Sequence, residues 1–121
     1  MSKRILVIED TEDNRQILRD LLTAAGYEIV EAMDGATGVA MAAELLPDII
    51  LMDIKLPVID GYEATRRIKA DPATRHIPII AVTSYALAGD ELKTREAGCD
   101  AYIAKPYSPR NLLEKVRQFL A

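Results

Sequence analysis

Apolar and polar positions divide this chain into short hydrophobic runs that alternate with longer amphipathic stretches. Two of the runs, Ile5–Ile8 and Ile49–Met52, show no polar alternation, which is typical of strands buried on both faces of a parallel sheet. We therefore expect five strands, over residues 4–9, 27–32, 48–52, 78–83 and 100–104.

The amphipathic stretches predict helices. The first stretch has an apolar face formed by Ile17, Leu18, Leu21, Leu22 and Ala25. Asp34, Asp60 and Ser108 stand where N-cap residues belong, and Gly26 stands where a C-cap glycine belongs. We expect helices over residues 12–25, between Asp34 and Pro47, and over residues 60–70, 86–97 and 108–120.

Five strand–helix units in one short chain define an α/β fold with a parallel sheet and right-handed crossovers. The open, doubly wound form is favoured, because a closed barrel of eight units needs roughly twice this length. With 121 residues, the whole chain, residues 1–121, is expected to be one domain.

Composition and charge limit the partners and the compartment that we expect for this protein. The net charge of −4 argues against nucleic acid as a partner, since that requires a concentrated basic surface. Cys99 is the single cysteine, so there is no internal disulfide, and a reducing compartment fits. No apolar stretch is long enough to span a membrane and no signal-peptide pattern is present, so we expect a cytoplasmic protein without a membrane partner.

Polar side chains follow the strand-like runs at the points where binding crevices form in parallel sheets. Glu9 and Asp10 follow the first run and Asp53 follows the third, and three gathered carboxylates repel one another unless a cation lies among them. Mg²⁺ suits such a site, with Asp10 and Asp53 as direct ligands and Glu9 acting through water. A carboxylate there can also act as a nucleophile toward a phosphoryl group.

The fourth and fifth strands end in groups that complement a phosphoryl group. Thr83 can donate a hydrogen bond to one phosphoryl oxygen, and Lys105 can neutralise another. Taken alone, Asp10 or Thr83 is more often a cap or turn residue, and Lys105 alone is a surface lysine. The combination at four of five strand ends is what indicates a site.

The whole chain resembles the response-regulator receiver domain of two-component signalling, with its CheY-like fold and strand order 2-1-3-4-5. The resemblance rests on these segments: Glu9-Asp10, Leu51-Met52-Asp53-Ile54-Lys55-Leu56-Pro57, Asp60-Gly61, Ala81-Val82-Thr83 and Lys105-Pro106. It implies that Asp53 accepts phosphate from a phosphohistidine on a sensor histidine kinase or a histidine phosphotransfer protein. The first acid, Glu9, departs from the aspartate of many members.

The resemblance also implies roles for individual residues. The metal ligands would be Glu9, Asp10, Asp53 and the backbone carbonyl of Lys55, while Thr83 and Lys105 would contact the phosphoryl group. A cis bond is implied at Lys105-Pro106.

The implied switch couples Thr83 to Tyr102 on the fifth strand, and so reshapes the face formed by helix four, strand five and helix five. Tyr102 otherwise reads as an ordinary half-buried strand tyrosine. Lys55 and Tyr85 occupy positions that control the rate of dephosphorylation in this family. The bulky tyrosine predicts slow self-dephosphorylation. The alternative is that both are residues of the loop surface.

Partners are expected on the face of helix four and strand five, or on helix one beside the site. Asn14, Arg15 and Leu18 form a candidate kinase-facing surface. The alternative, equally favoured by the sequence, makes Asn14 and Arg15 solvated helix residues and Leu18 a core residue.

Three other interpretations were weighed. A flavodoxin-like electron carrier needs a loop that binds the FMN phosphate after the first strand. Here that loop, Glu9 to Asp13, is acidic and would repel phosphate. A phosphatase with an aspartate nucleophile commonly has an acid two residues later, where this chain has Lys55. A pseudo-receiver would keep the fold and the interaction role without phosphorylation.

We therefore expect a receiver that catalyses only its own phosphorylation and dephosphorylation, and that is otherwise not an enzyme. It would signal to a downstream target protein by contact, or relay phosphate onward. A monomer is expected, with a phosphorylation-dependent dimer as the alternative.

Overall fold

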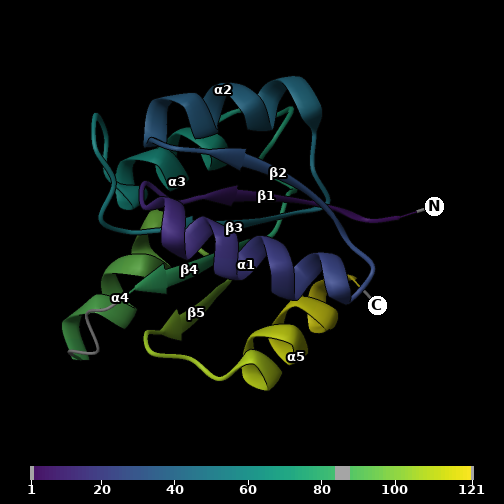
Figure 1. The fold of residues 1–121 in the computed structure, drawn as a ribbon. Helices are drawn as coiled ribbons and strands as arrows, with labels where there is room; N and C mark the ends of the chain where they lie inside the picture. The colour runs from purple at the N-terminus through teal and green to yellow at the C-terminus, as the bar shows by residue number, and fades with distance from the viewer. Residues whose placement is uncertain (1, 84–87, 121) are drawn as a thin grey trace.

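The computed structural model describes residues 2–83 and 88–120. The strands of these residues form one parallel sheet in the order β2-β1-β3-β4-β5, as predicted. The strand arrows run in one common direction across the molecule (Figure 1). Their bounds are β1 (Arg4–Ile8), β2 (Glu28–Ala32), β3 (Ile49–Asp53), β4 (Ile79–Thr83) and β5 (Ala101–Ala104).

Helices cover both faces of this sheet, which makes the fold doubly wound. One face carries α1 and α5, and the other carries α2, α3 and α4 (Figure 1). The helix bounds are α1 (Glu12–Ala24), α2 (Gly35–Leu45), α3 (Gly61–Ala70), α4 (Ala88–Ala97) and α5 (Pro109–Leu120). The prediction for the fourth helix began at residue 86, and residues 86 and 87 lie outside the described ranges.

The central strands are buried on both faces, which explains their unbroken apolar runs. In β1, Ile5 and Val7 pack toward α1 and α5, while Leu6 and Ile8 pack toward α2 and α3. The same division holds along β3. A strand that alternated apolar with polar residues would leave one of these two cores unfilled.

Most predicted helix ends are confirmed by backbone and side-chain contacts. The Asp34 carboxylate accepts a hydrogen bond from the Thr37 amide at 2.7 Å, and the Asp60 carboxylate accepts one from the Glu63 amide at 2.9 Å. Gly26 follows α1 with φ of +95°, a conformation that favours glycine.

Two residues of the predicted apolar face of α1 lie outside the core. Ile17 is 57% exposed, and Ala25, which follows the last residue of the helix, is exposed as well. The helix turns about 100° per residue, so Ile17 lies at the edge of a face that is centred on Leu18 and Leu22, which are buried. In the part of the chain that the structure describes, no helix combines the length and the apolar character needed to cross a membrane.

Candidate functional site

The parallel sheet brings the predicted polar residues to one edge. Glu9 and Asp10 follow β1, and Asp53 is the last residue of β3, the strand beside β1. Thr83 is the last residue of β4, and Lys105 directly follows β5. One carboxylate oxygen from each of the three acids lies within 4.8 Å of the others.

Glu9 is held tightly although it carries a charge. Its side chain is almost fully buried, and one carboxylate oxygen accepts a hydrogen bond from the Thr11 amide at 3.0 Å. The other oxygen accepts bonds from Asn14 Nδ2 at 3.2 Å and from Lys105 Nζ at 3.0 Å. Thr11 makes no side-chain cap of its own, so the Glu9 carboxylate supplies the anion at the start of α1.

Asp53 lies between Lys105 and the start of the next loop. Its Oδ1 accepts a hydrogen bond from the Lys55 amide at 3.2 Å, and its Oδ2 faces Lys105 Nζ at 3.4 Å. The Lys105 amide donates to the Thr83 carbonyl at 2.6 Å, which ties the lysine to the end of β4. The following bond, Lys105-Pro106, is cis, as expected.

Lys105 keeps its charge in this setting. Burial alone would lower the pKa of the ammonium, but the hydrogen bond to Glu9 and the charges of Asp53 and Glu9 outweigh burial and raise that pKa above its ordinary value. A permanent cation therefore stands beside Asp53.

The three acids remain crowded in spite of Lys105. A side-chain hydrogen bond to Glu9, partial burial and the Glu9 charge raise the pKa of the Asp10 carboxyl above its ordinary value. Glu9 and Asp53 are buried, whereas Asp10 is exposed to solvent. Several carboxylate oxygens with one side open to water match the preference of Mg²⁺ for few protein ligands and several waters.

Thr83 and Tyr102 project from the same face of the sheet. In the β4–β5 register, Thr83 pairs with Ala104 and Tyr102 pairs with Ala81. Since strand side chains alternate between faces, these two are diagonal neighbours on one face. Thr83 is buried, whereas Tyr102 is half-buried and lines hollows beside α4 and α5. Tyr85 lies outside the described residues.

The candidate kinase-facing surface of α1 needs correction. Arg15 is buried with 7% of its surface exposed, and Leu18 is a core residue. Asn14 is partly buried and bonds to Glu9. The spacing of Glu12 and Arg15 predicts their ion pair, but it gives no signal that Arg15 is buried.

Gly61 leaves room for Asp53. A side chain at Gly61 would collide with the Asp53 carbonyl oxygen and would come within 2.7 Å of Ile54 Cα. We expect Gly61→Ala to lower the free energy of unfolding by about 1–3 kcal/mol, because rigid backbone must shift to accept the methyl group. Denaturant titration measures the loss.

Gly38→Ala is a comparison in which the crowding is with a side chain and not with backbone. A Cβ at Gly38 would come within 2.5 Å of Ile8 Cδ1, and Ile8 is fully buried, so we expect a loss here too, partly offset by the gain in helix propensity of α2. Parent-like stability in Gly61→Ala would contradict the role given to the Asp53 backbone.

The fold and the position of the acidic cluster define a receiver domain. The family model described as the response regulator receiver domain matches residues 5–117. The chain therefore belongs to the response regulator receiver family. Members are modules of two-component signalling that are typically non-enzymatic.

Among curated proteins, the chain is similar to the polar-differentiation response regulator DivK of Brucella ovis, with 44% identity over 120 residues, covering 99% of this chain and 98% of that protein. Among solved structures, it is similar to the receiver domain of sensor histidine kinase PA1611 from Pseudomonas aeruginosa, which has a magnesium ion coordinated in the active site cleft. That match has 38% identity and a TM-score of 0.93, covering 99% of this chain and 98% of the other. The chemotaxis protein CheY4 of Vibrio cholerae matches with a TM-score of 0.92 and 25% identity, covering 98% of this chain and 99% of the other.

Proposed function

We propose that residues 1–121 act as one receiver domain in which Asp53 accepts a phosphoryl group, in a Mg²⁺-dependent reaction, from a phosphohistidine on a sensor histidine kinase or a histidine phosphotransfer protein. The observation that carries this proposal is the position of Asp53, which lies 3.4 Å from the Lys105 ammonium and within 4.8 Å of the Glu9 and Asp10 carboxylates. Such a position suits a nucleophile that must meet a negatively charged group.

The chemistry follows from the groups at the strand ends. An Asp53 carboxylate oxygen attacks phosphorus, the bond to the donor nitrogen breaks, and an acyl phosphate forms. Lys105 then pairs with a phosphoryl oxygen, and the Thr83 hydroxyl donates to another. Glu9, Asp10, Asp53 and the Lys55 carbonyl would hold Mg²⁺, which would screen the attacking carboxylate from the phosphoryl oxygens.

Thr83 and Tyr102 couple the phosphorylation of Asp53 to the shape of the protein surface. When Thr83 moves toward the phosphoryl group, space opens on the face that it shares with Tyr102, and the tyrosine ring turns inward. This alters the face of α4, β5 and α5, where a downstream target binds or from which phosphate relay is controlled. Lys55 and Tyr85 tune the loss of the phosphoryl group.

An apolar groove beside the site suits the phosphate donor. The groove has a volume of about 460 Å³ and runs between α1 and the start of α5, with Ile17, Leu21 and Tyr107 among its lining residues. Its end at Glu9 and Lys105 reaches the acidic cluster. A donor helix that docks here brings its histidine to Asp53.

The receiver is proposed to act in the cytoplasm. It is also proposed to be a monomer.

This docking predicts that Ile17→Glu slows phosphotransfer from a protein donor by about 10-fold, because a charge would enter an apolar contact. The measurement uses an autophosphorylated histidine kinase that phosphorylates the parent. Leu92→Glu, at a comparably exposed apolar residue of α4, is the control and should transfer normally. If Ile17→Glu also slowed labelling by acetyl phosphate to the same degree, the effect would lie in the site and not in docking.

The proposed function is tested by intact mass after incubation with acetyl phosphate, with Mg²⁺ or with EDTA. We expect a phosphate adduct on the parent that requires Mg²⁺ and is absent from Asp53→Asn. Asp60→Asn is the matched control, since asparagine also caps helices, and should retain the adduct.

An adduct that persists in Asp53→Asn would contradict the assignment of Asp53. A parent that gives no adduct but binds beryllofluoride would accept phosphate only from proteins. A parent that does neither would be a pseudo-receiver, and the proposal would fail.

A further inference from the structure

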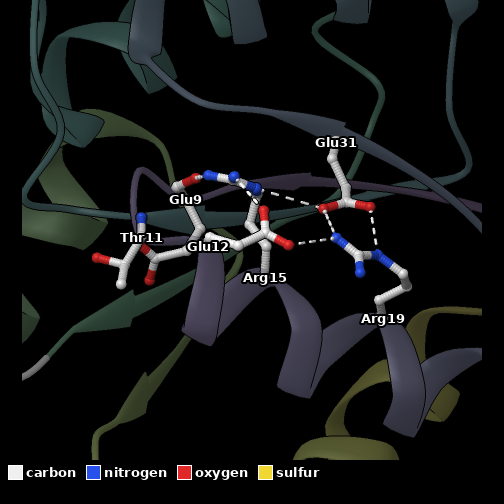
Figure 2. A network of polar contacts seen from close by, with 6 residues as sticks. All are labelled: Glu9, Thr11, Glu12, Arg15, Arg19 and Glu31. Atoms are coloured by element: carbon white, nitrogen blue, oxygen red, sulfur yellow. Dashed lines mark hydrogen bonds and ion pairs between the residues drawn. The ribbon is translucent and has the colours of Figure 1, made fainter.

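Arg15 is a buried cation outside the group of acids and lysine described above. It lies on the first turns of α1, and Figure 2 shows its guanidinium directed toward the end of β1 and toward Glu31 of β2. Only 7% of its surface is exposed. Burying an arginine is costly unless its donors are satisfied, so its partners indicate what the burial achieves.

The partners of Arg15 include the main chain of the site itself. Nη1 donates to the backbone carbonyl of Glu9 at 2.9 Å. The other guanidinium nitrogens contact the carboxylates of Glu12 and Glu31, the latter at 3.4 Å from Nε. The planar guanidinium thus lies between the Glu9 carbonyl, just after β1, and the Glu31 carboxylate of β2 (Figure 2).

The Glu9 peptide is consequently fixed on both sides. Its amide donates to the Ala32 carbonyl at the end of β2, at 3.0 Å, while its carbonyl accepts from Arg15. The carbonyl direction sets where the chain turns into Asp10, the next residue. The Arg15 contact therefore adds a backbone restraint, one residue before Asp10, to the side-chain contacts that hold the Glu9 carboxylate.

Arg19 provides an internal comparison, because it belongs to the same network without touching the site. Its guanidinium makes two bonds to Glu31, at 2.7 and 2.8 Å, and one to Glu12 at 3.3 Å. None of these contacts is with Glu9, and the Arg19 side chain is 37% exposed. Hydrogen bonding from Arg19 also lowers the pKa of Glu31, which therefore stays charged opposite Arg15.

We propose that Arg15 is a positioning residue of the metal site: by holding the Glu9 carbonyl, it fixes the two carboxylates at the end of β1 relative to Asp53. The inference rests on the proposed Mg²⁺-dependent function.

The test compares Mg²⁺ affinity, measured by titration calorimetry without a phosphodonor, in the parent, Arg15→Met, Arg15→Lys and Arg19→Met. Residues that support metal ligands commonly change affinity by about 10- to 100-fold when removed, and we expect a loss of about 10-fold in Arg15→Met. Arg19→Met should stay within about 2-fold of the parent, because it leaves the Glu9 carbonyl contact in place.

A metal-free readout separates this inference from the proposed function. The Thr11 amide donates to the Glu9 carboxylate, so its hydrogen exchange reports where that carboxylate lies. We expect faster exchange at Thr11 in Arg15→Met and unchanged exchange in Arg19→Met, with no Mg²⁺ present. A parent that bound no Mg²⁺ would overturn the proposed function and, with it, the metal role of Arg15.

Arg15→Lys keeps the test decisive if Arg15→Met does not fold. A lysine ammonium retains the charge near Glu31 but cannot span to the Glu9 carbonyl at the same time. We therefore expect weakened Mg²⁺ binding and faster Thr11 exchange here too. Parent-like affinity and exchange in every folded Arg15 variant would overturn the proposal.

Discussion

Replacing Lys105 by methionine is expected to slow phosphorylation of Asp53 by about 100-fold while Mg²⁺ binds more tightly than in the parent. Lys105 contacts both Glu9 and Asp53. Its ammonium therefore competes with an entering cation for the same carboxylates. In the proposed reaction it would stabilise the phosphoryl oxygens, so Mg²⁺ affinity and phosphorylation rate should change in opposite directions.

The same substitution leaves two buried acids without their ammonium. Breaking a buried ion pair by removing one partner costs about 3–5 kcal/mol. Because the Lys105 side chain keeps 22% exposure, we expect a smaller loss, about 2 kcal/mol, in the absence of Mg²⁺. Added Mg²⁺ should recover much of this stability.

Titration calorimetry, acetyl phosphate labelling rates and denaturant titrations measure the three effects. Lys93→Met, which removes an exposed lysine of α4, is the control and should match the parent in all of them. Should Mg²⁺ affinity fall together with the labelling rate, Lys105 would be acting by shaping the site and not through its charge.

Asp10→Asn is expected to have the opposite effect on stability. Mg²⁺ affinity should fall by at least about 10-fold, because an ionised ligand is lost. The metal-free protein should become more stable by about 0.5 kcal/mol, a modest gain because Asp10 is exposed and its repulsion with Glu9 is screened.

The sign of this second prediction follows from the pKa of Asp10, which the fold raises. A carboxyl whose pKa is higher in the folded state binds protons more tightly there than in the unfolded chain. Ionising it as the pH rises through that range lowers the free energy of unfolding, and Asp10→Asn removes this loss. As the pH is lowered, the Mg²⁺ affinity of the parent should likewise begin to fall at a higher pH than it would with an aspartate of ordinary pKa, because Asp10 is protonated earlier.

Thermal unfolding at low salt, with and without Mg²⁺, and at neutral and acidic pH, measures these changes. Asp13→Asn, at an exposed acid of α1 outside the cluster, removes the same charge as a control. A stability gain in Asp13→Asn equal to that in Asp10→Asn would mean that net charge, and not crowding in the site, is responsible.

The fold was predictable because hydrophobic burial dictates it residue by residue. Strands such as β1 and β3 must fill two cores, so they can be recognised as unbroken apolar runs. The gathering of Glu9, Asp53 and Lys105 was predictable for a related reason, since parallel strands deliver their carboxyl ends to one edge.

The environment of α1 was harder to predict, because it depends on tertiary contacts. The sequence marks Arg15 as polar and Ile17 as apolar, yet the first is buried and the second exposed. Arg15 gains partners from β1 and β2 that spacing along the helix cannot reveal. Ile17 borders a groove whose far wall includes Tyr107, a residue distant in the chain.

The contact between Glu9 and Lys105 joins residues 96 positions apart. The acceptor site therefore closes only after the last strand has joined the sheet, late in any folding sequence that begins at the N-terminus. A chain still under synthesis exposes Asp53 long before Lys105 emerges from the ribosome. If Asp53 is the proposed phosphate acceptor, nascent chains should consequently be poor acceptors, and only molecules whose sheet is complete should be phosphorylated.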